Sequence, residues 1–146
     1  MVIPTFAHLP VPLRFPGQKS EIRAVILDKD NCISENYALE VYGPYKDKFE
    51  ALKAAYPGNR LLIVSNSSGT QDDKDDVQLE SPSQIAVVGD RLFTDVMMAN
   101  MMGAWGVWVR DGVDVKYSSA FSGFEKGLHD FLVKRGYQPP SPLSKS

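Results

Sequence analysis

The stretch "AVILDKDNCI", residues 24–33, places Asp28 and Asp30 directly after an apolar run. Two other polar groups follow apolar runs in the same way: "SNSSGT", residues 65–70, and "GDRLFTD", residues 89–95. Carboxylates that converge on one space repel each other unless a cation lies between them. Mg²⁺ suits a site with few carboxylate ligands and a substrate phosphate. The residue types therefore predict a magnesium site that handles a phosphate group.

Such a site can transfer a phosphoryl group through a covalent intermediate. One aspartate can attack phosphorus and form an aspartyl-phosphate, while another moves protons. The small polar loop at 65–69 is suited to hydrogen-bond the phosphate oxygens. Each pattern is common by itself, but the three together, each at the end of an apolar run, are far more specific.

The elements that must position these residues are strands alternating with helices. We expect strands within residues 22–28, 60–70, 84–95 and 105–112, and helices within 45–59, 94–106 (starting near a Thr94 cap) and 124–137. This alternation predicts an α/β fold with a parallel sheet, in which ligands bind beyond the C-terminal ends of the strands. The three polar groups should therefore meet at one edge of the sheet.

Composition limits the alternatives. The chain has 146 residues, 43% of them hydrophobic, which is enough for one compact domain. With 16 basic and 18 acidic residues, no overall field attracts nucleic acid, and we expect no nucleic-acid partner. Cys32 is the single cysteine and is expected to fill the core. No apolar stretch approaches the roughly 18–20 residues of a membrane-spanning helix, so any membrane association should be peripheral.

The N-terminal residues 1–20 are rich in proline and in apolar residues. Two interpretations are open: an arm packed on its own domain, or a segment that contacts a lipid surface. We expect the catalytic domain at 21–137 and a tail at 138–146. Four methionines, at positions 97, 98, 101 and 102, could form a lipid-contact stripe, but core packing of a helix is favoured.

Three stretches carry a resemblance to a known family: "AVILDKDNCI", "LLIVSNSSGTQDDKD" and "VVGDRLFTDVMMANMMGAWGVWVRDGV". They resemble the haloacid dehalogenase (HAD) superfamily of phosphatases and, more narrowly, its mitochondrial phosphatidylglycerophosphatase branch. The resemblance implies a Rossmann-like parallel sheet with helices on both faces and little or no cap domain. It also implies these roles: Asp28 as nucleophile, Asp30 as general acid and base, Ser65 and Asn66 as phosphate-binding residues, Asp28, Asp90 and the Asp30 carbonyl as Mg²⁺ ligands, and Asp95 and Arg91 as supporting residues.

For two of these residues a second reading stays open. Asp95 could cap a helix or belong to the metal shell. Arg91 could reach an anionic head group or lie on the surface.

By the same resemblance, the substrate is phosphatidylglycerophosphate and the product phosphatidylglycerol, in cardiolipin biosynthesis. The reaction would take place at the matrix face of the mitochondrial inner membrane, with peripheral membrane association and with homo-oligomer formation left open. Two rivals remain: a phosphatase for a soluble phosphate monoester, and a catalytically silent binding module.

The superfamily also needs a phosphate-binding lysine between the serine loop and the "IAVVGD" strand. Here that interval, "QDDKDDVQLESPSQ", is very short, and its one lysine, Lys74, lies among four aspartates and is not expected to be equivalent. We expect a segment that is absent because it is unresolved, with a chain break between Glu80 and Ser81. The alternative is a chain that is truly shortened.

Overall fold

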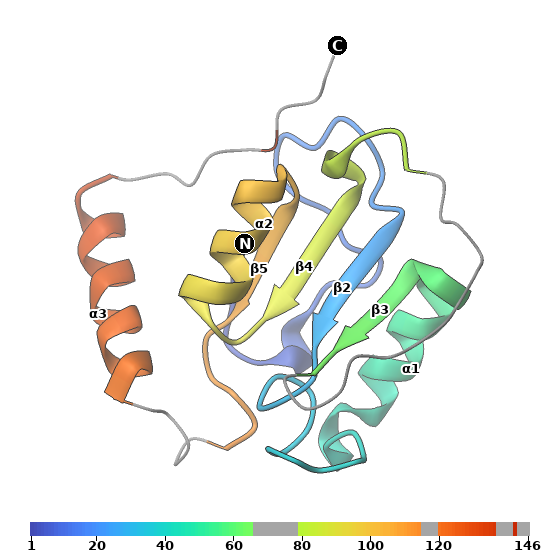
Figure 1. Cartoon of the computed structure of the whole chain (residues 1–146), viewed down its shortest axis with the longest axis horizontal. Helices are drawn as coiled ribbons and strands as arrows, with labels where there is room; N and C mark the ends of the chain where they lie inside the picture. The colour runs from blue at the N-terminus through green and yellow to red at the C-terminus, as the bar shows by residue number, and fades with distance from the viewer. Residues whose placement is uncertain (66–78, 115–119, 137–141, 143–146) are drawn as a thin grey trace.

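The computed structural model describes residues 1–65, 79–114, 120–136 and 142. Within them, five parallel strands form one sheet in the order β1-β5-β4-β2-β3. The strands are β1 (Val2–Ile3), β2 (Ala24–Asp28), β3 (Leu61–Val64), β4 (Ile85–Gly89) and β5 (Trp105–Val109). Their C-terminal ends point to the same edge (Figure 1). The predicted α/β class with a parallel sheet is confirmed, and no cap domain is evident among the described residues.

Helices lie on both faces of this sheet. They are α1 (Lys46–Ala55), α2 (Met97–Met102) and α3 (Ala120–Lys134). Leu52 of α1 packs with Val25 and Leu27 of β2 on one face, whereas Ala99 of α2 packs with Val87 on the other. Helix α3 lies to the side of α2 (Figure 1). None of the described helices combines the length and apolarity needed to cross a bilayer.

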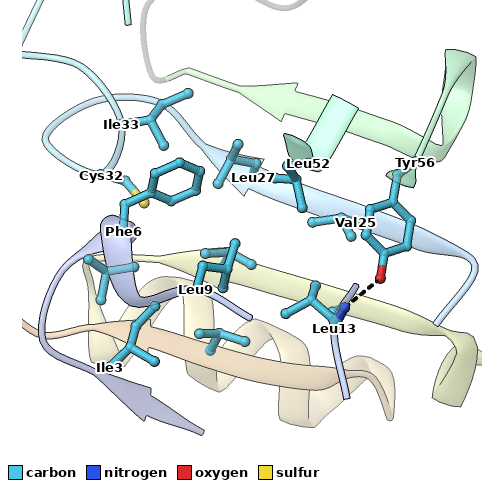
Figure 2. Packing of buried hydrophobic residues seen from close by; sticks show 14 of the residues in the cluster. Ile3, Phe6, Leu9, Leu13, Val25, Leu27, Cys32, Ile33, Leu52 and Tyr56 are labelled. Atoms are coloured by element: carbon cyan, nitrogen blue, oxygen red, sulfur yellow. Dashed lines mark hydrogen bonds between the residues drawn. The ribbon is translucent and has the colours of Figure 1, made fainter. Parts of the chain in front are cut away.

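Residues 1–20 pack on the domain, which confirms the first of the two interpretations of this segment. Val2 pairs with Trp108 and Ile3 with Val109, so β1 extends the sheet beyond β5. Phe6 and Leu9 are fully buried (Figure 2). The backbone N–H of Leu13 donates to the Tyr56 hydroxyl at 2.9 Å, which ties the segment to the end of α1. Most of the apolar side chains that suggested lipid contact are therefore used in the core.

The methionines of α2 are exposed, so the prediction that they pack in the core is wrong. The exposed fractions are 50% for Met97, 41% for Met98, 80% for Met101 and 40% for Met102. The helix has only six residues, and it meets the sheet through the small Ala99. The expected start at Thr94 is also incorrect, because a π-helical turn over Leu92–Val96 precedes α2 and takes in Thr94.

The chain break expected between Glu80 and Ser81 is absent. The peptide is continuous there, and the Glu80 N–H donates to Gln84 Oε1 at 2.8 Å. The Ser81 hydroxyl oxygen accepts from the Ser83 N–H at the start of a short 3₁₀ turn, Pro82–Gln84, which leads into β4.

Candidate active site

Three carboxylates meet at the C-terminal edge of the sheet. Asp28 is the last residue of β2, Asp90 directly follows β4, and Asp95 lies in the π-helical turn after it. One oxygen from each side chain lies within 4.8 Å of the oxygens of the other two. Because β2 and β4 are hydrogen-bonded neighbours in the sheet, their ends bring Asp28 and Asp90 together. The convergence of these strand ends is as the sequence predicts.

Their surroundings disfavour the ionisation of Asp28 and Asp95. Burial, together with the charges of Asp95 and Asp90, raises the pKa of Asp28 to about 8. Burial is also the main cause that raises the pKa of Asp95, and the neighbouring Asp90 adds to it. With a pKa of about 8, the Asp28 carboxyl group keeps its proton at neutral pH unless a positive charge is close. The three carboxylates are therefore suited to bind a cation.

Asp90 is held by an asparagine that sequence reasoning missed. Asn31 Nδ2 donates to Asp90 Oδ2 at 3.0 Å, and Asn31 Oδ1 accepts from the backbone N–H of Asp114 at 2.9 Å. Asn31 has φ 61°, in the left-handed region that asparagine tolerates better than most residues. Its place in the turn directly after Asp30 was the only sequence signal. The Trp108 indole N–H also donates to the Asp90 carbonyl, at 3.0 Å.

Asp30 and Ser65 form a second pair beside the carboxylates. The Ser65 hydroxyl donates to Asp30 Oδ2 at 2.8 Å, which links the end of β3 to the turn after β2. Asp30 is buried, with 9% of its surface exposed, and its carboxylate is not one of the three that converge. The residues expected to move protons and to bind phosphate are thus in contact with each other.

Asp95 lies in the first turn of the π-helical segment and also faces the other two carboxylates, so the structure is compatible with both of its predicted roles. Its Oδ2 accepts from the Arg91 N–H at 3.0 Å, and its Oδ1 accepts from the Thr94 hydroxyl at 3.2 Å. The same carboxylate belongs to the three that converge. The absence of a side chain at Gly89 leaves room for Asp95, because a Cβ added at residue 89 would lie 2.6 Å from the Asp95 Cβ. Gly89 is a second residue that sequence reasoning missed, although the "VVGD" run contains it.

These residues fit a divalent cation. Oδ1 of Asp90 is buried and, among the described residues, has no hydrogen-bond donor while the carboxylates are ionised. An orphaned carboxylate oxygen beside two further carboxylates suits the oxygen-preferring Mg²⁺. Asp28 and Asp90 are both in this group, and Asp95 joins them. Coordination of Mg²⁺ by the Asp30 backbone carbonyl stays a prediction.

The remaining predicted residues are less informative. Arg91 is exposed, and its backbone N–H, as described above, contacts Asp95. Asn66 and Lys74 lie outside the described residues.

A parallel α/β sheet with a group of aspartates and a serine hydroxyl at its C-terminal edge is the arrangement that the resemblance to HAD phosphatases implies. Comparison with known proteins narrows this class. The chain belongs to the family described as mitochondrial PGP phosphatase, whose model matches residues 1–80 and 76–114.

Curated relatives agree with this assignment. The chain is 38% identical to the mitochondrial phosphatidylglycerophosphatase GEP4 of Saccharomyces cerevisiae, over 90% of this chain and 87% of the yeast protein. It is 30% identical to a probable mitochondrial phosphatidylglycerophosphatase of Schizosaccharomyces pombe, over 75% of this chain and 72% of that protein. No solved structure matches the chain.

The relatives also contain residues that this chain lacks. The alignment with the budding yeast protein has 167 positions, whereas 90% of 146 residues is about 131, so about 36 positions face gaps in this chain. The two stretches that match the family model meet at residues 76–80. This overlap lies within the interval expected to carry the lysine.

Proposed function

We propose that this chain removes the terminal phosphate of phosphatidylglycerophosphate, with Mg²⁺ as cofactor and Asp28 as nucleophile. The observation that carries the proposal is the convergence of Asp28, Asp90 and Asp95 in a member of the phosphatidylglycerophosphatase family. The product is phosphatidylglycerol. The alternative of a soluble phosphate monoester has no observation in its favour.

The reaction uses the two carboxyl groups that follow β2 in different ways. An Asp28 oxygen attacks phosphorus and forms an aspartyl-phosphate as the bond to the glycerol oxygen breaks. Asp30 delivers a proton to that oxygen and then takes one from the water that hydrolyses the intermediate. The Ser65 hydroxyl donates to Asp30 at 2.8 Å in the free protein, and it turns to donate to the phosphate when the substrate binds. When bound, Mg²⁺ neutralises charge on the transferred group and favours the ionised form of Asp28.

The same relatives support a mitochondrial place of action. Two of them are named as mitochondrial, and the family description is mitochondrial as well. We place this chain at the matrix face of the mitochondrial inner membrane, in peripheral association with its phospholipid substrate. Fractionation of mitochondria with a carbonate wash and protease protection tests this placement. An integral protein, or one exposed to the intermembrane space, would contradict it.

Phosphate release tests the activity. The purified chain should release phosphate from phosphatidylglycerophosphate in detergent micelles with Mg²⁺, and EDTA should stop the release. Asp28→Asn should abolish turnover while the circular dichroism spectrum is unchanged. A fully active Asp28→Asn protein would exclude Asp28 as nucleophile. Turnover of a water-soluble phosphate monoester alone would favour the soluble substrate.

A second candidate is a catalytically silent binding module. The break in the family match at residues 76–80 favours it, because the resemblance places the phosphate-binding lysine in that interval. Without that lysine, the site would still bind Mg²⁺ but would stabilise the transferred phosphate poorly. Mg²⁺ binding by calorimetry, with phosphate release that is absent and identical in Asp28→Asn, would identify this case.

A further inference from the structure

Two stripes of exposed apolar side chains meet beside the site. Phe93, Met97 and Met101 are four residues apart along the π-helical turn and α2, and they are 37%, 50% and 80% exposed. Phe124 and Phe131 are seven residues apart on α3, and they are 63% and 51% exposed. The rings of Phe93 and Phe124 stack with their centroids 6.4 Å apart. We refer to these five residues as the apolar surface.

The apolar surface begins at the carboxylates. Phe93 lies in the chain between Asp90 and Asp95, so the ring pair with Phe124 is next to the C-terminal edge of the sheet. From there α2 and α3 both run away from that edge (Figure 1). A lipid lying along these helices would have its head group close to the aspartates.

Helix α3 is fixed with its apolar stripe turned outward. The Phe93 N–H donates to Glu125 Oε1 at 3.2 Å, and Lys126 Nζ contacts Asp111 Oδ1 at 3.1 Å. The His129 ring packs on Trp108 with centroids 4.9 Å apart. These polar and ring contacts hold one side of the helix to the domain, and the phenylalanines are left exposed. This is the reverse of the usual arrangement, in which a surface helix buries its apolar side.

The chemistry around the apolar surface favours a lipid over a protein. Lys134 and Arg135 end α3, and the Arg135 guanidinium lies 4.6 Å from the centre of the Phe131 ring. Apolar side chains with basic residues at the rim are typical of elements that lie in the interface of an anionic membrane. The N-terminal segment cannot provide this contact, since Phe6 and Leu9 are buried.

We propose that the apolar surface docks on an anionic phospholipid bilayer and presents the membrane-bound substrate to the aspartates. The inference rests on the proposed function, because a lipid substrate has to be reached in its membrane. It assigns membrane contact to α2 and α3 instead of to residues 1–20. It also explains why exposed methionines and phenylalanines gather beside the carboxylates.

Vesicle binding and turnover test the proposal together. The test variant is Met101→Gln/Phe131→Gln, in which both side chains are exposed and distant from the carboxylates along their helices. The control is Leu39→Gln, an equally polar change at a residue that is 95% exposed outside the apolar surface. Each protein is sedimented with phosphatidylcholine vesicles containing one-fifth phosphatidylglycerol. Phosphate release is measured on phosphatidylglycerophosphate in those vesicles and on a short-chain, monomeric form of the same lipid.

We expect the double variant to lose about tenfold or more in vesicle binding and in turnover of the vesicle substrate. Its turnover of the monomeric substrate should equal that of the wild type, and Leu39→Gln should match the wild type throughout. Unchanged vesicle binding by the double variant would overturn the proposal, as would failure of the wild type to bind. A dimer in analytical ultracentrifugation that the double variant dissociates, with vesicle binding intact, would also overturn it and assign the surface to a second copy. If the wild type binds vesicles but turns over neither substrate, the proposed function is wrong and the docking proposal still stands.

Discussion

Gly89→Ala is the substitution that most directly tests how the carboxylates are held. The added Cβ would lie 2.6 Å from the Asp95 Cβ, whereas ordinary contacts of this kind begin at 3.4 Å. The Oδ2 and Cγ atoms of Asp95 would lie closer still, so the Asp95 side chain and the backbone that carries it must shift. This shift moves the carboxylate away from its donors. It then weakens the hydrogen bonds from the Arg91 N–H and the Thr94 hydroxyl, which are 3.0 and 3.2 Å long.

Two effects of this shift oppose each other in the metal-free protein. Weakened hydrogen bonds to a charged group cost about 1.5–3 kcal/mol. In compensation, separation of Asp95 from Asp28 relieves a repulsion that raises the pKa of Asp28, and alanine is favoured over glycine in a strand by about 0.5–1 kcal/mol. The displaced backbone adds a packing cost of about 1–3 kcal/mol, so the melting temperature without metal should fall. Mg²⁺ binding has no such compensation, because it loses a correctly placed carboxylate.

We expect the Kd for Mg²⁺ to rise about 10–100-fold in Gly89→Ala. Isothermal titration calorimetry measures this constant, and thermal melts with and without MgCl₂ measure the stabilisation that binding provides. Gly43→Ala is the matched control, because a Cβ added at Gly43 meets no atom within 4 Å. A Gly89→Ala protein that binds Mg²⁺ as tightly as the wild type would refute the assignment of Asp95 to the metal site.

Three further predictions concern the site and the core. Because the pKa of Asp28 is about 8 without a cation, Mg²⁺ has to displace a proton from Asp28 below that pH. The apparent affinity for Mg²⁺ should therefore rise about tenfold from pH 6 to pH 7 and level off above pH 8. Calorimetry at a series of pH values measures this dependence, and a flat profile would contradict it. Asn31→Gly keeps the left-handed backbone but removes the donor to Asp90 and the acceptor of the Asp114 N–H. We expect about tenfold weaker Mg²⁺ binding in calorimetry and a lower melting temperature. Binding equal to the wild type would show that Asn31 does not position Asp90. Phe6→Ala should destabilise the protein by about 3–5 kcal/mol in urea unfolding, as for a large core residue, and a loss below about 1 kcal/mol would mean that the N-terminal segment is not part of the core.

The strands and their polar ends were predictable because the sequence marks them locally. Apolar, β-branched runs such as "AVILD" are typical of a central parallel strand, and the residues after such strands meet at one edge whatever the helices do. For that reason Asp28 and Asp90 could be expected to lie together, and they do. The Ser65–Asp30 contact follows from the same rule, since β3 is the neighbour of β2.

Other features depend on contacts between distant segments, and these left no local signal. The pairing of Val2 with Trp108 joins residues 106 positions apart, and the prolines of the N-terminal segment suggested only an irregular arm. The exposure of Met101 depends on how little of α2 meets the sheet, which its sequence does not reveal. Gly89 leaves space for Asp95, and Asn31 donates a hydrogen bond to Asp90. Neither role is visible from residue type alone.

The hydrogen bond from the Trp108 indole to the Asp90 carbonyl gives the molecule an intrinsic optical probe of its catalytic edge. Trp108 is almost fully buried and is held to the backbone of a carboxylate that converges with two others. The second tryptophan, Trp105, donates instead to the Ser83 carbonyl at 3.0 Å and stacks on Phe15, at the opposite end of the same strand. A change in emission that follows occupation of the carboxylates should therefore come from Trp108, and Trp105→Phe would isolate it without a dye or label.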